Sequence, residues 1–317
     1  MELKYIENVN AYNCILASVA TLAKHYGRDY QMIADSSWTL KYNVDEEYLR
    51  IGNQIDVVNQ VEIRNRAIQF HGFTWKFEEF DGGHRCVDDF AKLKFPFLAS
   101  VDLYYSRWSK AYKKYHFLHC IIICGYNSKD NVYSCVDPYY QYANYNVTKD
   151  DLFISIRKYG ELILYDRPQI IDEDYFHVIK EDITNINCNE NYENIKQLAL
   201  DFYYKLDINY EFDEYKGNLY AVPIMEKIRK IALYRDSYAC MLDYIFQVVR
   251  LQCVCEVSRL IKNSATLWKI LQSKLLKTYL SNSIHDEREK LCQLVFQIAE
   301  IEKEALETLK FNIYKEK

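Results

Sequence analysis

The sequence lacks the segments that direct a protein into or across a membrane. None of its 317 residues belongs to an apolar stretch of membrane-spanning length. The chain also shows no charged and then apolar signal region at Met-Glu-Leu-Lys-Tyr-Ile-Glu, its first seven residues. We therefore expect a cytoplasmic protein, whose ten cysteines are reduced thiols and not a disulfide framework.

Two further classes of function have little support. The formal net charge of −5 argues against a general nucleic-acid surface, because binding to phosphates depends on cationic contacts. A metal site is not expected either. The Cys253-x-Cys255 pair lies in an apolar helical run with no second pair or nearby histidine, so core packing is the better interpretation.

The residues that are present point to nucleophilic chemistry. Cys14 comes directly before an apolar helical run, His119 begins an apolar stretch, and Asp137 follows a second one after a short polar segment. A thiol becomes a good nucleophile when a base takes its proton and a third group orients that base. The order thiol, imidazole and carboxylate therefore predicts an acyl-transfer site made of Cys14, His119 and Asp137.

The surroundings of Cys14 favour a reactive thiol. Apolar residues form one stripe along 15–23, Asn13 suits an N-cap and Gly27 suits a C-cap, so a helix is expected to begin at Cys14. Helix N–H groups and the helix dipole stabilise a thiolate in the first turn. The alternative is that Cys14 is a small apolar residue in a core.

The segments 117–126 and 132–136 have strand composition, and the polar residues between them suit a turn, so a hairpin is expected. Either His119 or Ile121 then lies opposite Asp137, and both registers place His119 and Asp137 on one face. His116 is expected to point to the other face. The remaining histidines are interpreted as solvated or structural: His25, His71, His84, His177 and His285.

A tetrahedral oxyanion needs hydrogen-bond donors. The backbone N–H of Cys14 can supply one, and the side chain of Asn8 or Asn10 could supply another. Each asparagine could equally be an ordinary turn residue.

Three short patterns together resemble a known family. Asn8-x5-Cys14, His119-x5-Gly125-Tyr126 and Val136-Asp137-Pro138 are similar to motifs of papain-like, bacteriocin-processing-type cysteine peptidases. In those enzymes a glutamine six positions before the cysteine forms the oxyanion hole, so the resemblance selects Asn8 for this role. The first half of the chain also resembles the butirosin-type acyltransferases, which move an acyl group from a carrier protein to an amine.

The resemblance implies substrates and partners. The donor would be an acyl or peptidyl carrier protein with a phosphopantetheine thioester, the acceptor a small amine or diamine, and the enzyme would need no cofactor of its own. The setting would be natural-product biosynthesis of the nonribosomal-peptide type. A papain-like peptidase and a non-catalytic binding module remain as alternatives.

One basic segment departs from the acidic average of the chain. Lys110, Lys113 and Lys114 lie directly before the strand of His119. They are either part of a solvated loop or a docking surface for the acidic carrier protein, steering its approach.

The element pattern predicts an α+β fold with two domains. Residues 1–168 are expected to form a papain-like catalytic domain with an antiparallel sheet, and 169–317 a helical bundle covering the active-site cleft. Within the first domain we expect strands at 73–79, 96–104 and 161–165, and helices near 45–70, at 87–93 and at 149–159. Bundle helices are expected at 191–206, 219–233, 236–261, 265–279 and 286–309.

Overall fold

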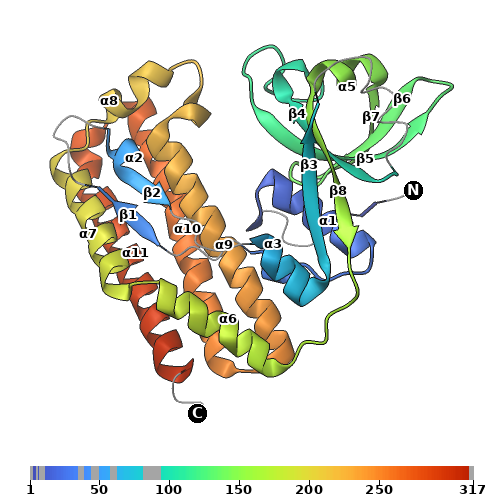
Figure 1. The fold of residues 1–317 in the computed structure, drawn as a ribbon. Coiled ribbons are helices and arrows are strands. Elements are labelled where there is room, and N and C mark those ends of the chain that lie inside the picture. Colours follow the sequence, from blue (N-terminus) through green and yellow to red (C-terminus); the bar gives the residue numbers. More distant parts are fainter. Residues whose placement is uncertain are drawn as a thin grey trace. The chain divides into compact units, whose positions relative to one another are not determined.

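The computed structural model describes residues 3–4, 6, 11–34, 39–43, 50–57, 63–80 and 94–313. The chain divides into two compact units, whose elements are labelled in Figure 1. Unit 1 contains residues 1–33 and 62–169, and unit 2 contains 34–61 and 170–317. The boundary between residues 169 and 170 lies one residue from the predicted domain boundary. The assignment of residues 34–61 to the first domain is corrected, because this segment belongs to unit 2.

Unit 1 is built on a six-stranded antiparallel sheet with the strand order β3-β8-β4-β5-β6-β7. The antiparallel α+β architecture predicted for this part of the chain is therefore confirmed. The strands are β3 (Phe73–Glu79), β4 (Phe97–Asp102), β5 (Leu118–Asn127), β6 (Val132–Asp137), β7 (Tyr142–Thr148) and β8 (Ile156–Leu164).

Helices of unit 1 are mostly short. They are α1 (Cys14–His25), η2 (Gln31–Ile33), α3 (Ile63–Arg66), the π-helical turn η3 (Ala67–His71), η4 (Leu103–Tyr105) and α5 (Lys149–Ser155). The helix predicted for 87–93 lies outside the described residues. Alternate positions of β4 and β5 supply a buried apolar cluster that includes Phe97, Ala99, Val101, Ile121 and Ile123, as expected for strands with one face on a core.

Strand β8 is longer than the sequence pattern predicts. The helix expected over 149–159 ends at Ser155, and β8 begins at Ile156 and pairs with both β3 and β4. Gly160 permits this double pairing, because a Cβ atom there would lie 2.4 Å from the carbonyl oxygen of Lys76. Strand β7 was not predicted; Tyr142, Tyr145, Val147 and Thr148 favour a strand, but two asparagines interrupt them, and pairing with β6 completes the element.

Unit 2 consists of a small hairpin and a set of helices. The hairpin is β1 (Leu40–Tyr42) and β2 (Ile55–Val57), with α2 (Ile51–Gln54) between them. Its apolar side chains Leu40, Tyr42, Ile51 and Ile55 are buried in the same core cluster as the long helices. This shared core is the physical reason why the segment belongs to unit 2.

The helices of unit 2 differ from the predicted set in their boundaries. They are α6 (Asp172–Asn185), α7 (Cys188–Tyr204), α8 (Ile208–Phe212), the turns η5 (Asp213–Tyr215) and η6 (Leu219–Ala221), α9 (Pro223–Val249), α10 (Gln252–Ser281) and α11 (Ile284–Ile313). Helix α6 was not predicted. The break between α9 and α10 falls at Arg250, which adopts a left-handed conformation with φ 58°, and not near 235 or 263.

A buried ion pair lies inside the helical core. The Arg235 guanidinium donates to both carboxylate oxygens of Glu302, at 3.0 and 2.9 Å, and both side chains are essentially inaccessible. Ser264 and Trp268 donate to the same carboxylate at 2.6 and 3.0 Å. Burial raises the pKa of Glu302, but the Arg235 charge and these donors outweigh it and hold the pKa below its usual value.

None of the helices in the described part of the chain is long and apolar enough to cross a membrane.

Candidate active site

Cys14 is the first residue of α1, as the sequence predicts. The Asn13 side chain caps the helix by accepting a hydrogen bond from the backbone N–H of Leu16 at 2.9 Å. At the other end Gly27, with φ 69°, follows the C-cap residue Tyr26, so the predicted capping glycine lies one position beyond the cap. The Cys14 N–H belongs to the first turn, whose N–H groups have no carbonyl partner within the helix.

The hairpin of β5 and β6 positions the other two residues. Ile122 pairs with Val136, and continuing this register by one residue places Ile121 opposite Asp137 and His119 diagonal to it. Both side chains lie on one face and meet: His119 Nε2 is 2.8 Å from Asp137 Oδ2. The structure therefore brings together the imidazole and the carboxylate that the sequence predicts.

Cys14 completes this arrangement. The His119 side chain and the backbone of Cys120 both act on its thiol and favour the thiolate. Because Nε2 of His119 faces Asp137, the other ring nitrogen, Nδ1, is the one available to the thiol. His119 is 2% exposed and Asp137 is fully buried, whereas Cys14 is partly exposed.

Electrostatics favour a charged pair between the thiol and the ring. Burial raises the pKa of Cys14, but its hydrogen bond and charge interaction with His119 outweigh burial and bring the pKa below its ordinary value. Burial lowers the pKa of His119, but hydrogen bonds to Asp137 and Cys14 raise it to about 9. Both shifts favour the ion pair of thiolate and imidazolium over the neutral thiol and imidazole.

Two contacts hold the site together. The buried Ser18 hydroxyl donates to the backbone carbonyl of Cys120 at 3.3 Å and so fastens α1 to β5. The backbone N–H of Tyr140 donates to Asp137 Oδ1 at 3.0 Å, which leaves Oδ2 for His119. Sequence reasoning missed both residues; the Asp137-Pro138 turn directly before Tyr140 was the available signal.

The other described histidines take no part in the cluster around Cys14. His116 binds Asp102 at 2.8 Å and has a side chain that is 65% exposed, in agreement with its predicted exclusion from the site. His71 is buried and accepts the backbone N–H of Met32 at 3.0 Å, and burial lowers its pKa to about 3. His25 and His177 are exposed. His84 and the side chain of His285 lie outside the described residues.

The predicted oxyanion donor Asn8 also lies outside the described residues, as does Asn10. The lysines of the predicted docking surface are described: Lys110, Lys113 and Lys114 are all exposed in the segment between η4 and β5. Lys113 Nζ lies 5.4 Å from the centre of the Tyr112 ring, and Arg107 of the same segment pairs with Asp151 at 3.1 Å.

No group of three or more metal-ligating side chains occurs among the described residues. Cys253, for which core packing was predicted, is buried within α10.

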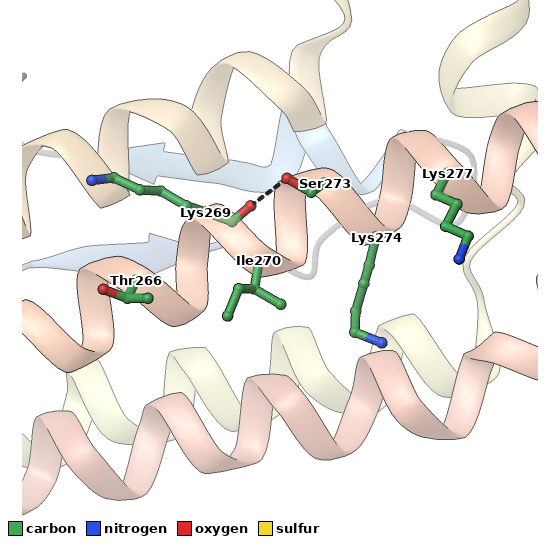
Figure 2. A pocket seen from close by; sticks show the side chains of 6 residues that line it. All are labelled: Thr266, Lys269, Ile270, Ser273, Lys274 and Lys277. Atoms are coloured by element: carbon green, nitrogen blue, oxygen red, sulfur yellow. Dashed lines mark hydrogen bonds between the residues drawn. The ribbon is translucent and has the colours of Figure 1, made fainter.

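Unit 2 carries an open groove of about 310 Å³ on α10 (Figure 2). It is lined by Thr266, Lys269, Ile270, Ser273, Lys274 and Lys277. Figure 2 shows these side chains along one helix, with the Ser273 hydroxyl bonded to the Lys269 carbonyl oxygen at 3.0 Å. The residues that line the groove include no histidine or carboxylate to activate its hydroxyl groups, so the candidate active site is the cluster around Cys14.

A comparison with protein families agrees with this assignment. Residues 2–161 match the model of the Peptidase_C39 like family, which covers Cys14, His119 and Asp137. The match spans half of the chain, and the protein belongs to this family. It is therefore a papain-like cysteine protein whose helices α6 to α11 follow the matched region. A search of curated proteins finds no match.

Proposed function

We propose that the protein is a cysteine acyltransferase that forms amide bonds. The observation that carries the proposal is the hydrogen bond between His119 and Asp137, together with a Cys14 thiol whose pKa the same His119 side chain lowers. A thiolate at a helix N-terminus, paired with an oriented imidazolium, is suited to attack a thioester carbonyl. The donor is an acyl or peptidyl group on the phosphopantetheine thiol of a carrier protein, and the protein itself uses no cofactor.

In the first half of the reaction the Cys14 thiolate attacks the thioester carbon. The oxyanion is stabilised by the Cys14 N–H and, as the sequence resemblance implies, by Asn8. When the carbon–sulfur bond to phosphopantetheine breaks, His119 gives its proton to the leaving thiolate. The products are acyl-Cys14 and the free carrier thiol, with His119 neutral.

In the second half an amine attacks acyl-Cys14. Neutral His119 takes the proton that the amine nitrogen loses, and the Cys14 thiolate leaves as the amide forms. This restores the thiolate and imidazolium. Asp137 keeps the ring oriented and stabilises its charge in both halves.

Two features support synthesis over hydrolysis. The exposed lysines 110, 113 and 114 precede the His119 strand and suit the docking of an acidic carrier. The helical unit extends the chain beyond the region that matches the peptidase-type family.

A papain-like peptidase is the second candidate, because the family match is equally compatible with it and the same three residues would serve. Water would then replace the amine as the acceptor.

Intact-protein mass spectrometry distinguishes these functions. The protein is incubated with a panel of acyl-carrier thioesters, first without and then with small amines, and in parallel with a peptide library. We expect an acyl adduct on Cys14 that an amine discharges as an amide, and no adduct on the Cys14→Ala variant. Peptide cleavage without carrier-dependent acylation would establish the peptidase. If neither reaction occurs, a binding module is the remaining function.

A further inference from the structure

The turn between β6 and β7 places aromatic rings against the imidazole of the candidate site. The centre of the Tyr140 ring lies 4.9 Å from that of His119, at an interplanar angle of 33°. Tyr139 approaches the same ring from another direction, at 5.8 Å and 66°. Tyr140 is 45% exposed, so its ring lies between buried His119 and solvent.

The same residue also touches the carboxylate through its main chain. Its N–H donates to Asp137 Oδ1 at 3.0 Å, while Oδ2 binds His119. One residue therefore holds the carboxylate by its backbone and covers the imidazole by its side chain. The backbone contact acts on Asp137 and the ring contact acts on His119, the two residues that share a hydrogen bond.

The physical effect of such a cover follows from the behaviour of buried hydrogen bonds. Water that reaches a carboxylate–imidazole pair competes for both groups and raises the local dielectric, which weakens the interaction. An aromatic ring over the imidazole excludes water without offering a competing charge. It also restricts the rotation of the imidazole about its side-chain bonds.

We propose that Tyr140 is a positioning residue whose ring keeps water from the His119–Asp137 hydrogen bond and thereby maintains the thiolate of Cys14. The inference rests on the proposed role of these three residues and adds a fourth that acts through His119. The groups that face His119 are Cys14 from α1, Asp137 from β6, and Tyr139 and Tyr140 from the following turn. Any loss of charge stabilisation at His119 must therefore appear at Cys14.

The chain offers a matched control in Tyr142. Its ring lies 6.3 Å from that of Tyr140 and its exposure is 48%, close to that of Tyr140. Unlike Tyr140, it has no described ring contact with His119. Comparing Tyr140→Ala with Tyr142→Ala therefore separates the effect on His119 from the general loss of an exposed aromatic ring.

The test measures the rate at which iodoacetamide alkylates Cys14 as a function of pH, with the modified residue assigned by mass spectrometry. This reports the thiolate directly and needs no knowledge of the substrate. For Tyr140→Ala we expect the pH of half-maximal rate to rise by about one unit, equivalent to tenfold less thiolate at a given pH below it. Tyr140→Phe keeps the ring and should behave as the unchanged protein, as should Tyr142→Ala.

The outcomes separate this inference from the proposed function. If Cys14 of the wild-type protein titrates as an ordinary thiol, the proposed function is overturned. If the pH of half-maximal alkylation of Cys14 is low in the wild-type protein and equally low in Tyr140→Ala, only the role of Tyr140 is overturned. An equal shift in Tyr142→Ala would also overturn it. Circular dichroism of each variant confirms that the fold is retained.

Discussion

Ser18 and Cys120, separated by 102 positions in the sequence, are joined by a hydrogen bond of 3.3 Å from the Ser18 hydroxyl to the Cys120 carbonyl oxygen. Ser18 lies one turn beyond Cys14 on α1, and Cys120 follows His119 on β5. The bond therefore fixes the distance between the elements that carry the thiol and the imidazole. The backbone of Cys120 in turn helps to lower the pKa of Cys14.

The Ser18→Ala variant tests this connection. Removal of the hydroxyl leaves a buried carbonyl without this donor, so we expect a loss of about 1–2 kcal/mol in the free energy of unfolding. Cys14 should also react more slowly with iodoacetamide at pH 6. Thr21→Ala is the control, because the buried Thr21 hydroxyl bonds the Ala17 carbonyl within α1 itself. Equal loss of Cys14 reactivity in both variants would contradict the connection.

The pH dependence of catalysis follows from the charged pair. Activity requires the Cys14 thiolate and protonated His119, whose pKa is raised to about 9. We expect kcat/KM to fall as the pH rises through about 9, and the acid limb to lie below the ordinary range of a thiol. In Asp137→Asn the alkaline limb should move to lower pH, because the carboxylate that raises the His119 pKa is gone, while some turnover remains.

Stability should follow the same titration. Folding raises the pKa of His119 from 6.5 to about 9, so its contribution is complete below pH 6.5 and is lost as the pH rises through about 9. Urea unfolding of the unchanged protein and of Asp137→Asn between pH 6 and 10 measures this. A stability difference between them that does not shrink across that range would contradict the assignment.

Charge reversal tests the proposed docking surface. The variant Lys110→Glu, Lys113→Glu, Lys114→Glu should raise the apparent KM for a carrier-bound donor several-fold at low salt, with kcat little changed, because electrostatics mainly affect encounter. Single reversals compared with Lys129→Glu, an exposed lysine in the β5–β6 turn, control for net charge. Unchanged kinetics at low salt would remove the docking role.

The buried ion pair of unit 2 should matter for stability and not for chemistry. Arg235→Met leaves the Glu302 carboxylate buried without its cation, so we expect a loss of about 3–5 kcal/mol in the free energy of unfolding. The control Lys269→Met removes an exposed partner of Asp236 and should cost less than about 1 kcal/mol. Chemical denaturation of both variants gives the comparison, and similar losses would show that burial of the pair is unimportant.

Local signals in the sequence identify the elements around the candidate site. The apolar stripe after Asn13 predicts α1, and β3 has the predicted bounds Phe73–Glu79. The strand composition of 117–126 and 132–136 and the turn between them place His119 and Asp137 on one face. Each of these patterns lies within a short window, where periodicity and capping are informative.

The features that sequence reasoning missed depend on distant partners. Strand β7 is defined by its pairing with β6, because the two asparagines between its strand-forming residues weaken the local pattern. Helix α10 continues through Ser264, where a break was predicted, because the buried Ser264 hydroxyl binds Glu302 on α11. The contact of Tyr140 with His119 is equally invisible in a one-dimensional pattern, since it requires the β6–β7 turn to fold back over the ring.

The membership of segment 34–61 in the helical core limits how this protein can be dissected. A fragment that stops at residue 168 would retain Leu40, Tyr42, Ile51 and Ile55 but lose the helices against which they pack. Four apolar side chains would then face water and promote aggregation. A soluble minimal catalytic fragment should therefore replace 34–61 with a short polar linker as well as omit everything after 169.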